Sequence, residues 1–400
     1  MLQGVCSPFF SQLARALVAE GEQVHRVHFN VGDMLYSRGA STRCQLRPDE
    51  LDGFYKDLFD RQEVTDVVVF GDQRPVHKPA IKLAKRRGIR VHVFEEGYFR
   101  PYWVTLERSG VNANSLLPRD PAWYRDVGKY IPRYRNGQPF TLSFPIRAAH
   151  DVAYHLGGAL NRICYPRYNT HAPYNAAAEY TGYIRRAVTL RRYAEQDRRI
   201  VEQTIVRPQP HFLLPLQLDS DAQIRDHSAF NDMRDVMDHV MQSFATCAPA
   251  YARLVVKNHP LSPGLRNYRK ITGALARQHG LEGRVDFLES GHMPTLLNHV
   301  KGVVTVNSTA GASALFHQTP TIALSNPIYS MPGLTHQGGL DTFWQSPEKP
   351  DRVLFKRFRN TVIHTTQING GFYTRDGIEM AAENAVTALL ARKSRLEQYL

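Results

Sequence analysis

The sequence has few cysteines, no long apolar run and no export signal. Its four cysteines, Cys6, Cys44, Cys164 and Cys247, are scattered and form no CxxC pair. This distribution excludes a disulfide framework and the usual zinc motifs. No window reaches about 18 consecutive apolar residues, so no membrane-spanning helix is predicted. The amino terminus lacks the basic and long apolar regions of a signal peptide, and we therefore expect a cytoplasmic protein.

Positive charge is what the chain has in excess. Its 400 residues carry a formal net charge of +13, with 42% hydrophobic and 22% charged residues. This composition is typical of a globular chain with about two domains. The charge favours an anionic partner, such as an acidic membrane face, an acidic substrate or nucleic acid. No zinc finger, RNP-like strand or helix-turn-helix supports nucleic acid, which we do not expect as a partner.

Basic residues concentrate between Tyr183 and Val201, in a predicted helix with apolar residues among the arginines. A solvated helical face and a patch that lies on lipid are equally compatible with this pattern. If the patch meets lipid, replacing its arginines by Gln should weaken binding to anionic vesicles at low salt. The arginines to replace are Arg185, Arg186, Arg191 and Arg192.

Short apolar runs alternate with helix-like segments in two stretches of the chain. The first has strands at 65–72 and 89–97 around a helix at 79–87, which predicts a βαβ unit. The apolar runs of the second stretch lie at 211–218, 252–260, 284–290, 302–306 and 321–324. Strands that alternate with helices predict parallel sheets with helices on both faces. We therefore expect an α/β fold with two Rossmann-like domains that face each other across a cleft.

Three segments follow from this pattern. Residues 1–203 form a Rossmann-like domain with a Tyr- and Arg-rich helical insertion. Residues 204–345 form a second Rossmann-like domain. Residues 346–400 form a helical segment that packs back on the first domain.

Polar side chains stop each apolar run. In α/β sheets the ligands bind at the carboxyl ends of the strands, so these stops are candidate site residues. Any one of them is equally compatible with ordinary turn chemistry. They are Glu96, Gln217, Asp219, Asp221, Gln223, Lys257, His259, Glu289, Asn307, Ser308 and Thr309.

The stretch NSTAGASALF begins with three hydrogen-bonding side chains at Asn307, Ser308 and Thr309. A helix N-cap alone explains one of them. Small residues at 310–312 would also let a ligand approach the backbone, and the amino end of a helix attracts phosphate. The motifs GxxxxGK[ST] and GxGxxG are absent. The phosphate therefore fits a nucleotide-sugar better than ATP.

Lys257 and His259 follow a strand, and alternation along an extended chain places them on one side. Together they can neutralise a leaving phosphate, although His259 is equally compatible with a scaffold role. Asp221 and Glu96 are the carboxylates suited to sugar transfer. The alternatives are a helix cap for Asp219 or Asp221 and a solvated side chain for Glu96.

The chain resembles the bacterial capsule polysaccharide biosynthesis/export family, and within it the initiating, lipid-terminus branch of β-Kdo transferases. The most specific pairing is FEEGYFRPYWVTLE with NSTAGASALF, and the matching segments run from Leu2 to Trp344. Further matches are LQGVCSPFF, VVFGDQRPVHKPAI, LLPLQLDSDAQIRDHS, VVKNHP and LTHQGGLDTFW. The longer, extending branch of the family carries duplicated motifs, whereas each motif occurs once in this chain.

The resemblance implies a retaining β-Kdo glycosyltransferase of GT-B-like architecture that uses CMP-Kdo and needs no metal or other cofactor. The acceptor would be a phosphatidylglycerol-type lipid at the inner face of the cytoplasmic membrane, with other capsule synthesis and export proteins as partners. Asp221 matches the carboxylate that forms the covalent intermediate, Asp219 is the second candidate, and Glu96 is the acceptor base. The implied CMP-sugar site comprises His259, Ser308 and Thr309, with Gln217, Gln223, Lys257, Glu289, Asn307 and Ser313.

Three points stay open from the sequence. In the resembling family a first strand precedes LQGVCSPFF, whereas only Met1 precedes it here, so either the start site is misassigned or the first strand is curtailed. A non-catalytic adaptor for capsule export would keep the fold and basic surface without needing Asp221 or His259. A transferase that uses CMP-sialic acid or a UDP-sugar as its donor is the third functional hypothesis, after the Kdo transferase and the adaptor.

Overall fold

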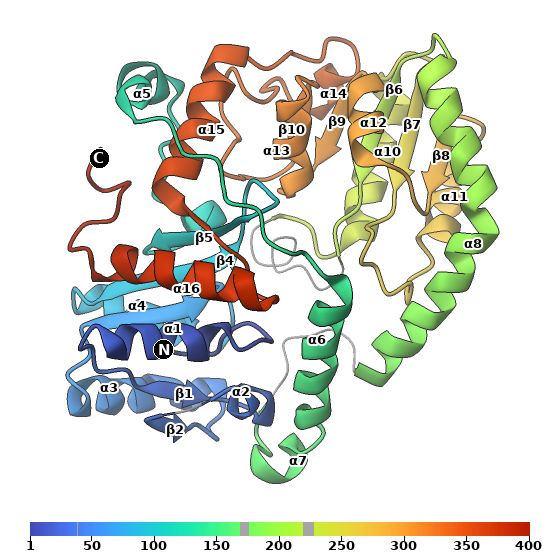
Figure 1. The fold of residues 1–400 in the computed structure, drawn as a ribbon. Helices are drawn as coiled ribbons and strands as arrows, with labels where there is room; N and C mark the ends of the chain where they lie inside the picture. Colours follow the sequence, from blue (N-terminus) through green and yellow to red (C-terminus); the bar gives the residue numbers. More distant parts are fainter. Residues whose placement is uncertain (38, 169–175, 219–227) are drawn as a thin grey trace. The chain divides into compact units, whose positions relative to one another are not determined.

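Two α/β units make up the chain, each built around its own sheet (Figure 1). The computed structural model describes residues 1–37, 39–168, 176–218 and 228–400. The first unit comprises 1–117, 130–171 and 359–400, and the second comprises 118–129 and 172–358. The boundaries expected at 203 and 346 differ from this division. Helix α8 (Ala176–Val206) belongs to the second unit, and the division near the carboxyl end falls within α15 (Arg352–Thr366).

The sheet of the second unit is entirely parallel, with the strand order β10-β9-β6-β7-β8. Its strands coincide with the five predicted apolar runs, and each strand is shorter than its run. The strands are β6 (His211–Pro215), β7 (Arg253–Lys257), β8 (Val285–Leu288), β9 (Gly302–Thr305) and β10 (Thr321–Ala323). Both the predicted α/β class and the parallel sheet are confirmed here.

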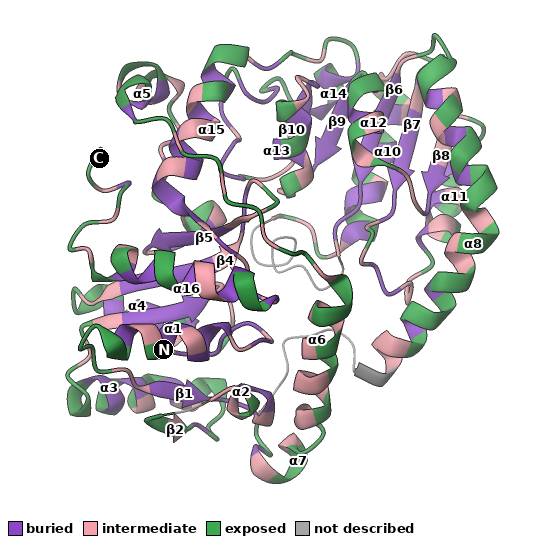
Figure 2. Ribbon diagram, viewed as in Figure 1, coloured by how far each residue is buried: buried purple, intermediate pink, exposed green. Residues whose placement is uncertain are grey.

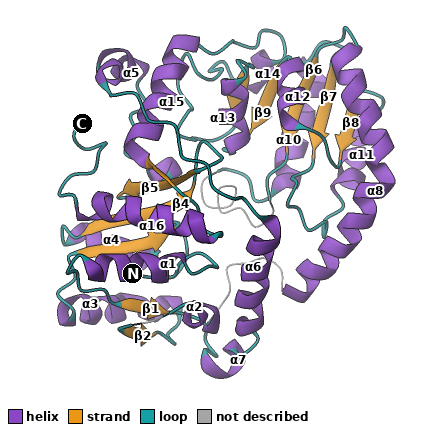
Figure 3. Ribbon diagram, viewed as in Figure 1, coloured by secondary structure: helices purple, strands orange, loops and turns teal. Residues whose placement is uncertain are grey.

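Alternating side chains of these strands enter two separate cores. Phe212 and Leu214 face a core that includes α10 (Met233–Cys247) and α11 (Tyr268–Gln278). Leu213 faces the other core, to which α8 and two further helices contribute. Both faces are therefore covered, which explains why the strands read as continuous apolar runs. Figure 2 shows these strands in the buried colour and Figure 3 shows the helices around them.

The remaining helices of the second unit are short. They are α5 (Pro121–Asp126), α12 (Met293–His299), α13 (Thr309–Phe316) and α14 (Leu340–Phe343).

The sheet of the first unit is mixed, which corrects the expectation of a parallel sheet. Its order is β11-β5-β4-β3, and β5 runs antiparallel to both neighbours. The predicted βαβ unit is present as β3, α4 and β4. The elements are β3 (Asp66–Phe70), α4 (Lys78–Arg86), β4 (Arg90–Glu96), β5 (Trp103–Arg108) and β11 (Gln367–Asn369). The strand β11 comes from the carboxyl-terminal part of the chain, of which residues 359–400 belong to the first unit.

The amino-terminal residues form backbone hydrogen bonds with two strands. The Leu2 N–H donates to Val68 O at 2.9 Å, and the Val27 N–H donates to Met1 O at 3.0 Å. The segment therefore lies between β3 and β1 (Arg26–His28), which pairs in parallel with β2 (Ser41–Arg43). The side chains of Leu2 and Val5 are buried.

Helices cover both faces of the first unit's sheet as well. Val68 and Phe94 pack in the core that holds α1 and α16, whereas Val67 and Val93 pack with α3 and α4. None of the helices within the described ranges is both long and apolar enough to cross a membrane. The helices of this unit are α1 (Phe9–Ala19), α2 (Val31–Leu35), α3 (Leu51–Arg61), α6 (Phe144–Gly158), α7 (Asn161–Cys164) and α16 (Arg375–Leu390). Short 3-10 turns lie at Pro48–Glu50, Asn112–Asn114 and Gly128–Tyr130.

His28 of β1 should make the first unit sensitive to acid. Its side chain is 2% exposed, and burial, aided by the charge of Arg26, lowers the pKa of His28 to about 4. Neither ring nitrogen has a hydrogen-bond partner among the described residues. The unfolded chain takes up the proton near pH 6.5, so stability from this group is lost as the pH falls from about 6.5 towards 4.

We predict that the free energy of unfolding falls by about 2 kcal/mol between pH 7 and 5 through His28 alone. Urea unfolding at both pH values would measure this loss, and His28→Leu should remove it. The control is His299→Leu, at an exposed position, which should keep the full pH dependence. An equal pH dependence in His28→Leu and the wild type would contradict the prediction.

Candidate functional site

The strand order of the second unit reverses at β6. The chain proceeds from β6 to β7 and β8 on one side, and then returns to β9 and β10 on the other. The carboxyl ends of β6 and β9 therefore flank a topological switch point, which is where open α/β sheets bind ligands. The candidate site consists of the residues that follow these strand ends.

Two amide side chains join the loops at the switch point. Gln217 follows β6 and is buried, and Asn307 follows β9. Gln217 Nε2 donates to Asn307 Oδ1 at 3.0 Å, and the Asn307 backbone N–H donates to Gln217 Oε1 at 3.3 Å. These two bonds fix the orientation of both amides. The structure thus brings together two residues predicted from distant parts of the sequence.

Ser308 is the N-cap of α13. Its Oγ accepts from the Ala310 backbone N–H at 3.1 Å, as an N-cap does. Thr309 and Ser313 are exposed and lie four residues apart, so they share one side of the helix. The amino end of α13 therefore presents hydroxyl groups together with the positive end of its dipole beside the switch point.

Gly311 of α13 also has a packing role. A Cβ atom on Gly311 would overlap the Tyr329 hydroxyl group. That hydroxyl donates to Ser308 O at 2.5 Å, and Tyr329 is buried. Burial raises the pKa of Tyr329 well above its usual range, so the phenol stays protonated. Gly311 leaves room for Tyr329, whose hydrogen bond to Ser308 O stabilises the turn before α13.

Lys257 ends β7 and is buried, with Nζ donating to Asn258 O at 3.2 Å. Burial, together with the nearby charge of Arg186, lowers the pKa of Lys257. His259 lies beyond the strand, in a turn where its Nδ1 accepts from the Leu261 backbone N–H at 3.1 Å. The alternation of side chains along β7 therefore does not extend to His259. In the neutral ring the proton resides on Nε2, which makes Nε2 the donor atom.

Three predicted site residues lie outside the described residues. Asp219, Asp221 and Gln223 belong to the segment that follows Gln217 in the sequence. Gln217, which the structure places at the switch point, precedes this segment in the sequence. The roles of Asp219, Asp221 and Gln223 stay predictions.

Glu289 occupies the centre of a buried ion-pair network. Its carboxylate accepts from Arg186 and from Asn258 Nδ2 at 3.0 Å, and Arg269 Nε lies 3.4 Å away. Asp197 of α8 accepts from the Ser290 backbone N–H at 2.8 Å and lies 3.5 Å from Arg269. The network ties α8 to the ends of β7 and β8. Sequence reasoning missed this set, because its members come from four separate segments.

This network also corrects the basic patch expected on α8. Arg186 is 5% exposed and points into the protein, because its guanidinium is paired with Glu289. Arg185, Arg191 and Arg192 are exposed, so only these members of the expected set can meet an external partner.

Glu96 ends β4 in the first unit and is surrounded by cationic side chains. Arg147 lies 3.6 Å and Arg100 lies 3.9 Å from its carboxylate, and the Tyr373 hydroxyl donates to it at 3.5 Å. The guanidinium of Arg147 stacks over the Tyr373 ring at 4.5 Å. Sequence reasoning missed Arg147 and Tyr373, which come from distant segments. The cap at Ser143 signals the start of α6, but no local pattern links that helix to β4.

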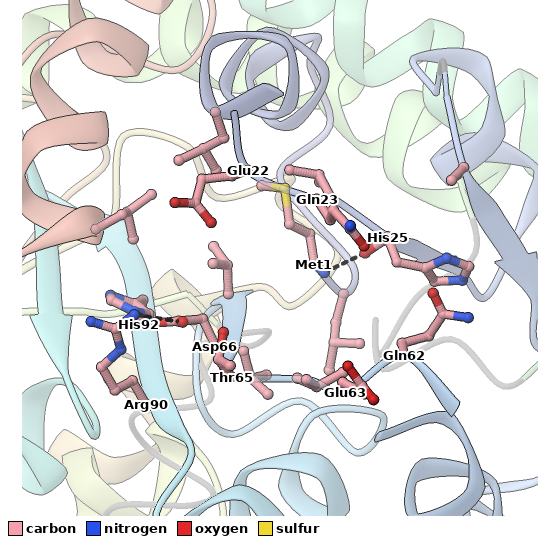
Figure 4. Close-up of a pocket in the computed structure, with 18 of the residues that line it drawn as sticks. Met1, Glu22, Gln23, His25, Gln62, Glu63, Thr65, Asp66, Arg90 and His92 are labelled. Atoms are coloured by element: carbon pink, nitrogen blue, oxygen red, sulfur yellow. Dashed lines mark hydrogen bonds and ion pairs between the residues drawn. The ribbon is translucent and has the colours of Figure 1, made fainter. Parts of the chain in front are cut away.

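A cavity of about 730 Å³ lies at the opposite end of the first unit's sheet (Figure 4). Its lining includes Asp66 and Arg90, which begin β3 and β4, together with His92. Burial raises the pKa of Asp66, but hydrogen bonds from His92 and Arg90 outweigh it and hold the pKa below its usual range. Among the predicted site residues that the structure describes, none lines this cavity.

Comparison with known proteins gives one matching family model and several similar proteins. The model for capsule polysaccharide biosynthesis protein matches residues 65–373. The capsule polysaccharide export protein KpsS of Escherichia coli is 40% identical over 376 residues, which cover 93% of this chain and 96% of that protein. The capsule polysaccharide modification protein LipB of Neisseria meningitidis is 34% identical over 382 residues, which cover 94% of this chain and 91% of that protein.

Among solved structures, the β-Kdo 2,7 transferase KpsC of Thermosulfurimonas dismutans is similar with a TM-score of 0.44 and 14% identity. The match covers 92% of this chain and 98% of that chain. A UDP-GlcNAc 2-epimerase of Neisseria meningitidis matches with a TM-score of 0.27 and 12% identity, over 97% of this chain and 98% of that chain.

We predict that Glu289→Gln lowers the free energy of unfolding of the second unit by about 3 kcal/mol. The substitution leaves the buried guanidinium of Arg186 without its counter-charge, and it removes one of the two acidic partners of the partly buried Arg269. Urea unfolding at pH 7 would measure the loss. Glu282→Gln is the matched control, because Glu282 is exposed and should tolerate the change within about 0.5 kcal/mol. Equal stabilities of the two variants would show that the network contributes little.

Proposed function

The chain belongs to the capsule polysaccharide biosynthesis protein family, and we propose that it is the retaining β-Kdo transferase that starts the capsule's lipid terminus. In this proposal Kdo moves from CMP-Kdo to a phosphatidylglycerol-type lipid. The enzyme works at the inner face of the cytoplasmic membrane, alongside other capsule synthesis and export proteins.

One observation carries the donor side of the proposal. The Gln217–Asn307 pair and the capped amino end of α13 meet at the switch point of a parallel sheet. Such a point suits a nucleotide phosphate, which the helix dipole and the hydroxyls of Ser308, Thr309 and Ser313 can hold. Asp221 follows Gln217 by only a few residues in the sequence.

The proposed first step forms a covalent intermediate. A carboxylate oxygen of Asp221 bonds to the anomeric carbon of Kdo while the bond from that carbon to the CMP phosphate oxygen breaks. CMP leaves as a phosphate monoester. His259 Nε2 is a suitable donor to the leaving phosphate, and Lys257 supplies positive charge. No divalent metal is needed in this step.

The proposed second step releases the enzyme. An acceptor hydroxyl oxygen bonds to the anomeric carbon, Asp221 is displaced, and the hydroxyl proton passes to Glu96. Arg147 and Arg100 hold the Glu96 carboxylate and also offer positive charge to an anionic acceptor. The net charge of +13 is consistent with an anionic donor, acceptor and membrane surface together.

We predict that Asp221→Ala abolishes Kdo transfer while CMP binding persists. The assay mixes protein, CMP-Kdo made in situ and a fluorescent phosphatidylglycerol analogue, and detects the added Kdo by mass spectrometry. Asp57→Ala, at an exposed position of the first unit, is the control and should leave the rate unchanged.

The alternatives give different results in this assay. Product from Asp221→Ala but none from Asp219→Ala would make Asp219 the nucleophile. A wild-type protein that binds CMP but yields no product with this or a longer acceptor would favour the export adaptor. Stabilisation by CMP-sialic acid or a UDP-sugar, with none by CMP-Kdo, would indicate another donor.

We predict that Gln217→Ala weakens CMP binding about tenfold, because two neutral hydrogen bonds that shape the site are worth about 0.5–1.5 kcal/mol each. Isothermal titration calorimetry with CMP would measure this change. Gln242→Ala removes the same side chain from an exposed position of α10 and should bind CMP like the wild type. Unchanged affinity in Gln217→Ala would place the nucleotide away from the switch point.

A further inference from the structure

Helix α6 of the first unit contacts its own unit through polar side chains. His150 Nδ1 lies 2.9 Å from the Tyr36 hydroxyl, and the Tyr154 hydroxyl donates to Asp33 at 2.8 Å. Arg147 pairs with Glu96 from the same side of the helix. These three residues recur at intervals of three and four, so they form one face. No residue of α6 is fully buried, as its green and pink colouring in Figure 2 shows.

The opposite face of α6 is apolar and exposed. Val152 is 37% exposed and Leu156 is 68% exposed, and the same spacing continues through Leu160 at 52% to Ile163 of α7 at 79%. We call this row the apolar stripe. Its members are Leu142, Pro145, Ala149, Val152, Leu156, Leu160 and Ile163.

This arrangement reverses the usual amphipathic helix. A helix on a water-soluble protein ordinarily buries its apolar side and exposes its polar side. Here hydrogen bonds and ion pairs hold the helix from within, and apolar side chains point outward. A continuous exposed apolar row indicates a surface that meets another non-aqueous phase or molecule.

The charge around the stripe identifies its partner. From the start of α6 to just past α7, residues 144–168 contain Asp151 as their single acidic residue. The basic residues of this range are Arg147, which pairs with Glu96, together with Arg162 and Arg167. A second copy of this chain, docked symmetrically, would bring these positive charges against each other. An anionic surface instead attracts them.

We infer that the apolar stripe lies in the surface of an anionic phospholipid bilayer. Apolar side chains flanked by arginines are the composition of helices that rest in the interface, with the arginine stems along the acyl boundary and their charges among the headgroups. Phe144, which begins α6 and is 65% exposed, adds an aromatic group of the kind enriched at that depth.

This docking surface deepens the proposed function and rests on it for the acceptor's identity. Arg147 pairs with Glu96 from the opposite face of the same helix, so the docked helix would carry the Glu96 site on its protein-facing side. The binding itself needs no sugar donor. Vesicle binding and Kdo transfer can therefore fail separately, which keeps the two proposals distinguishable.

The test is flotation of the full chain with vesicles of phosphatidylcholine and phosphatidylglycerol, compared with phosphatidylcholine alone. Wild-type protein should float with the anionic vesicles and hardly with the neutral ones. Leu156→Asp and Ile163→Asp should each weaken the binding at least tenfold. Val18→Asp is the matched control, because it introduces the same charge at a side chain that is 57% exposed on α1 of the same unit. Its binding should stay at the wild-type level.

A tryptophan replacement gives a second measurement of vesicle binding, one that does not require the binding to be weakened. Emission of Leu156→Trp should shift to shorter wavelength on addition of anionic vesicles, whereas emission of Val18→Trp should not. An emission of Leu156→Trp that is already short without lipid would mean that protein covers the stripe, and would overturn the inference. So would a wild-type dimer that Leu156→Asp converts to monomer while vesicle binding stays unchanged.

Discussion

Covering both faces of each sheet with helices decides where polar chemistry can occur in this protein. A strand whose two sides are both packed has no place for a catalytic side chain along its length. Functional groups must therefore collect where strands end. In the second unit the five strands run in one direction, so their carboxyl ends share one edge, and the reversal of strand order opens a position between β6 and β9. The pair Gln217–Asn307 occupies that position.

In the sequence, a charged residue that stabilises the fold cannot be told from one that binds a ligand. Glu289 stands at a strand end, as a ligand-binding residue would, but Arg186, Asn258 and Arg269 surround its carboxylate. A buried pair of this kind adds little to stability over apolar packing, while losing one partner is costly. Its effect is to fix the direction of α8 against the sheet ends. The inner face of α6 is fixed by the same type of contact.

Strands were predictable because a doubly covered strand reads as an uninterrupted apolar run. The β3–α4–β4 unit and β6 to β10 were found in this way. The strand β5 was not, since its run ends in charged residues, and β11 pairs with it from more than 250 residues away in the chain, as Ile368 does with Val104. The contact between Gly311 and the buried Tyr329 could not be predicted either, because the two residues share no local pattern.

Pairings between distant side chains explain the other differences. The capping role of Ser308 follows from a local pattern, whereas the contact between Arg147 and Glu96 joins two segments with no shared motif. Local rules describe which residues begin and end an element. Which elements become neighbours depends on the packing of the whole unit, and one sequence carries little direct information about that.

The return of the carboxyl-terminal segment to the first unit has a consequence for the order of folding. Helix α16 packs its alanines against α1, and β11 extends the sheet beside β5, so the core of the first unit is incomplete until the last part of the chain has been made. The second unit lies wholly before that point in the sequence. During synthesis it can finish its core first, although the other unit began earlier. The first unit therefore spends most of translation with α1 but without α16 on one side of its sheet, and a chaperone that binds nascent apolar strands would find its target there.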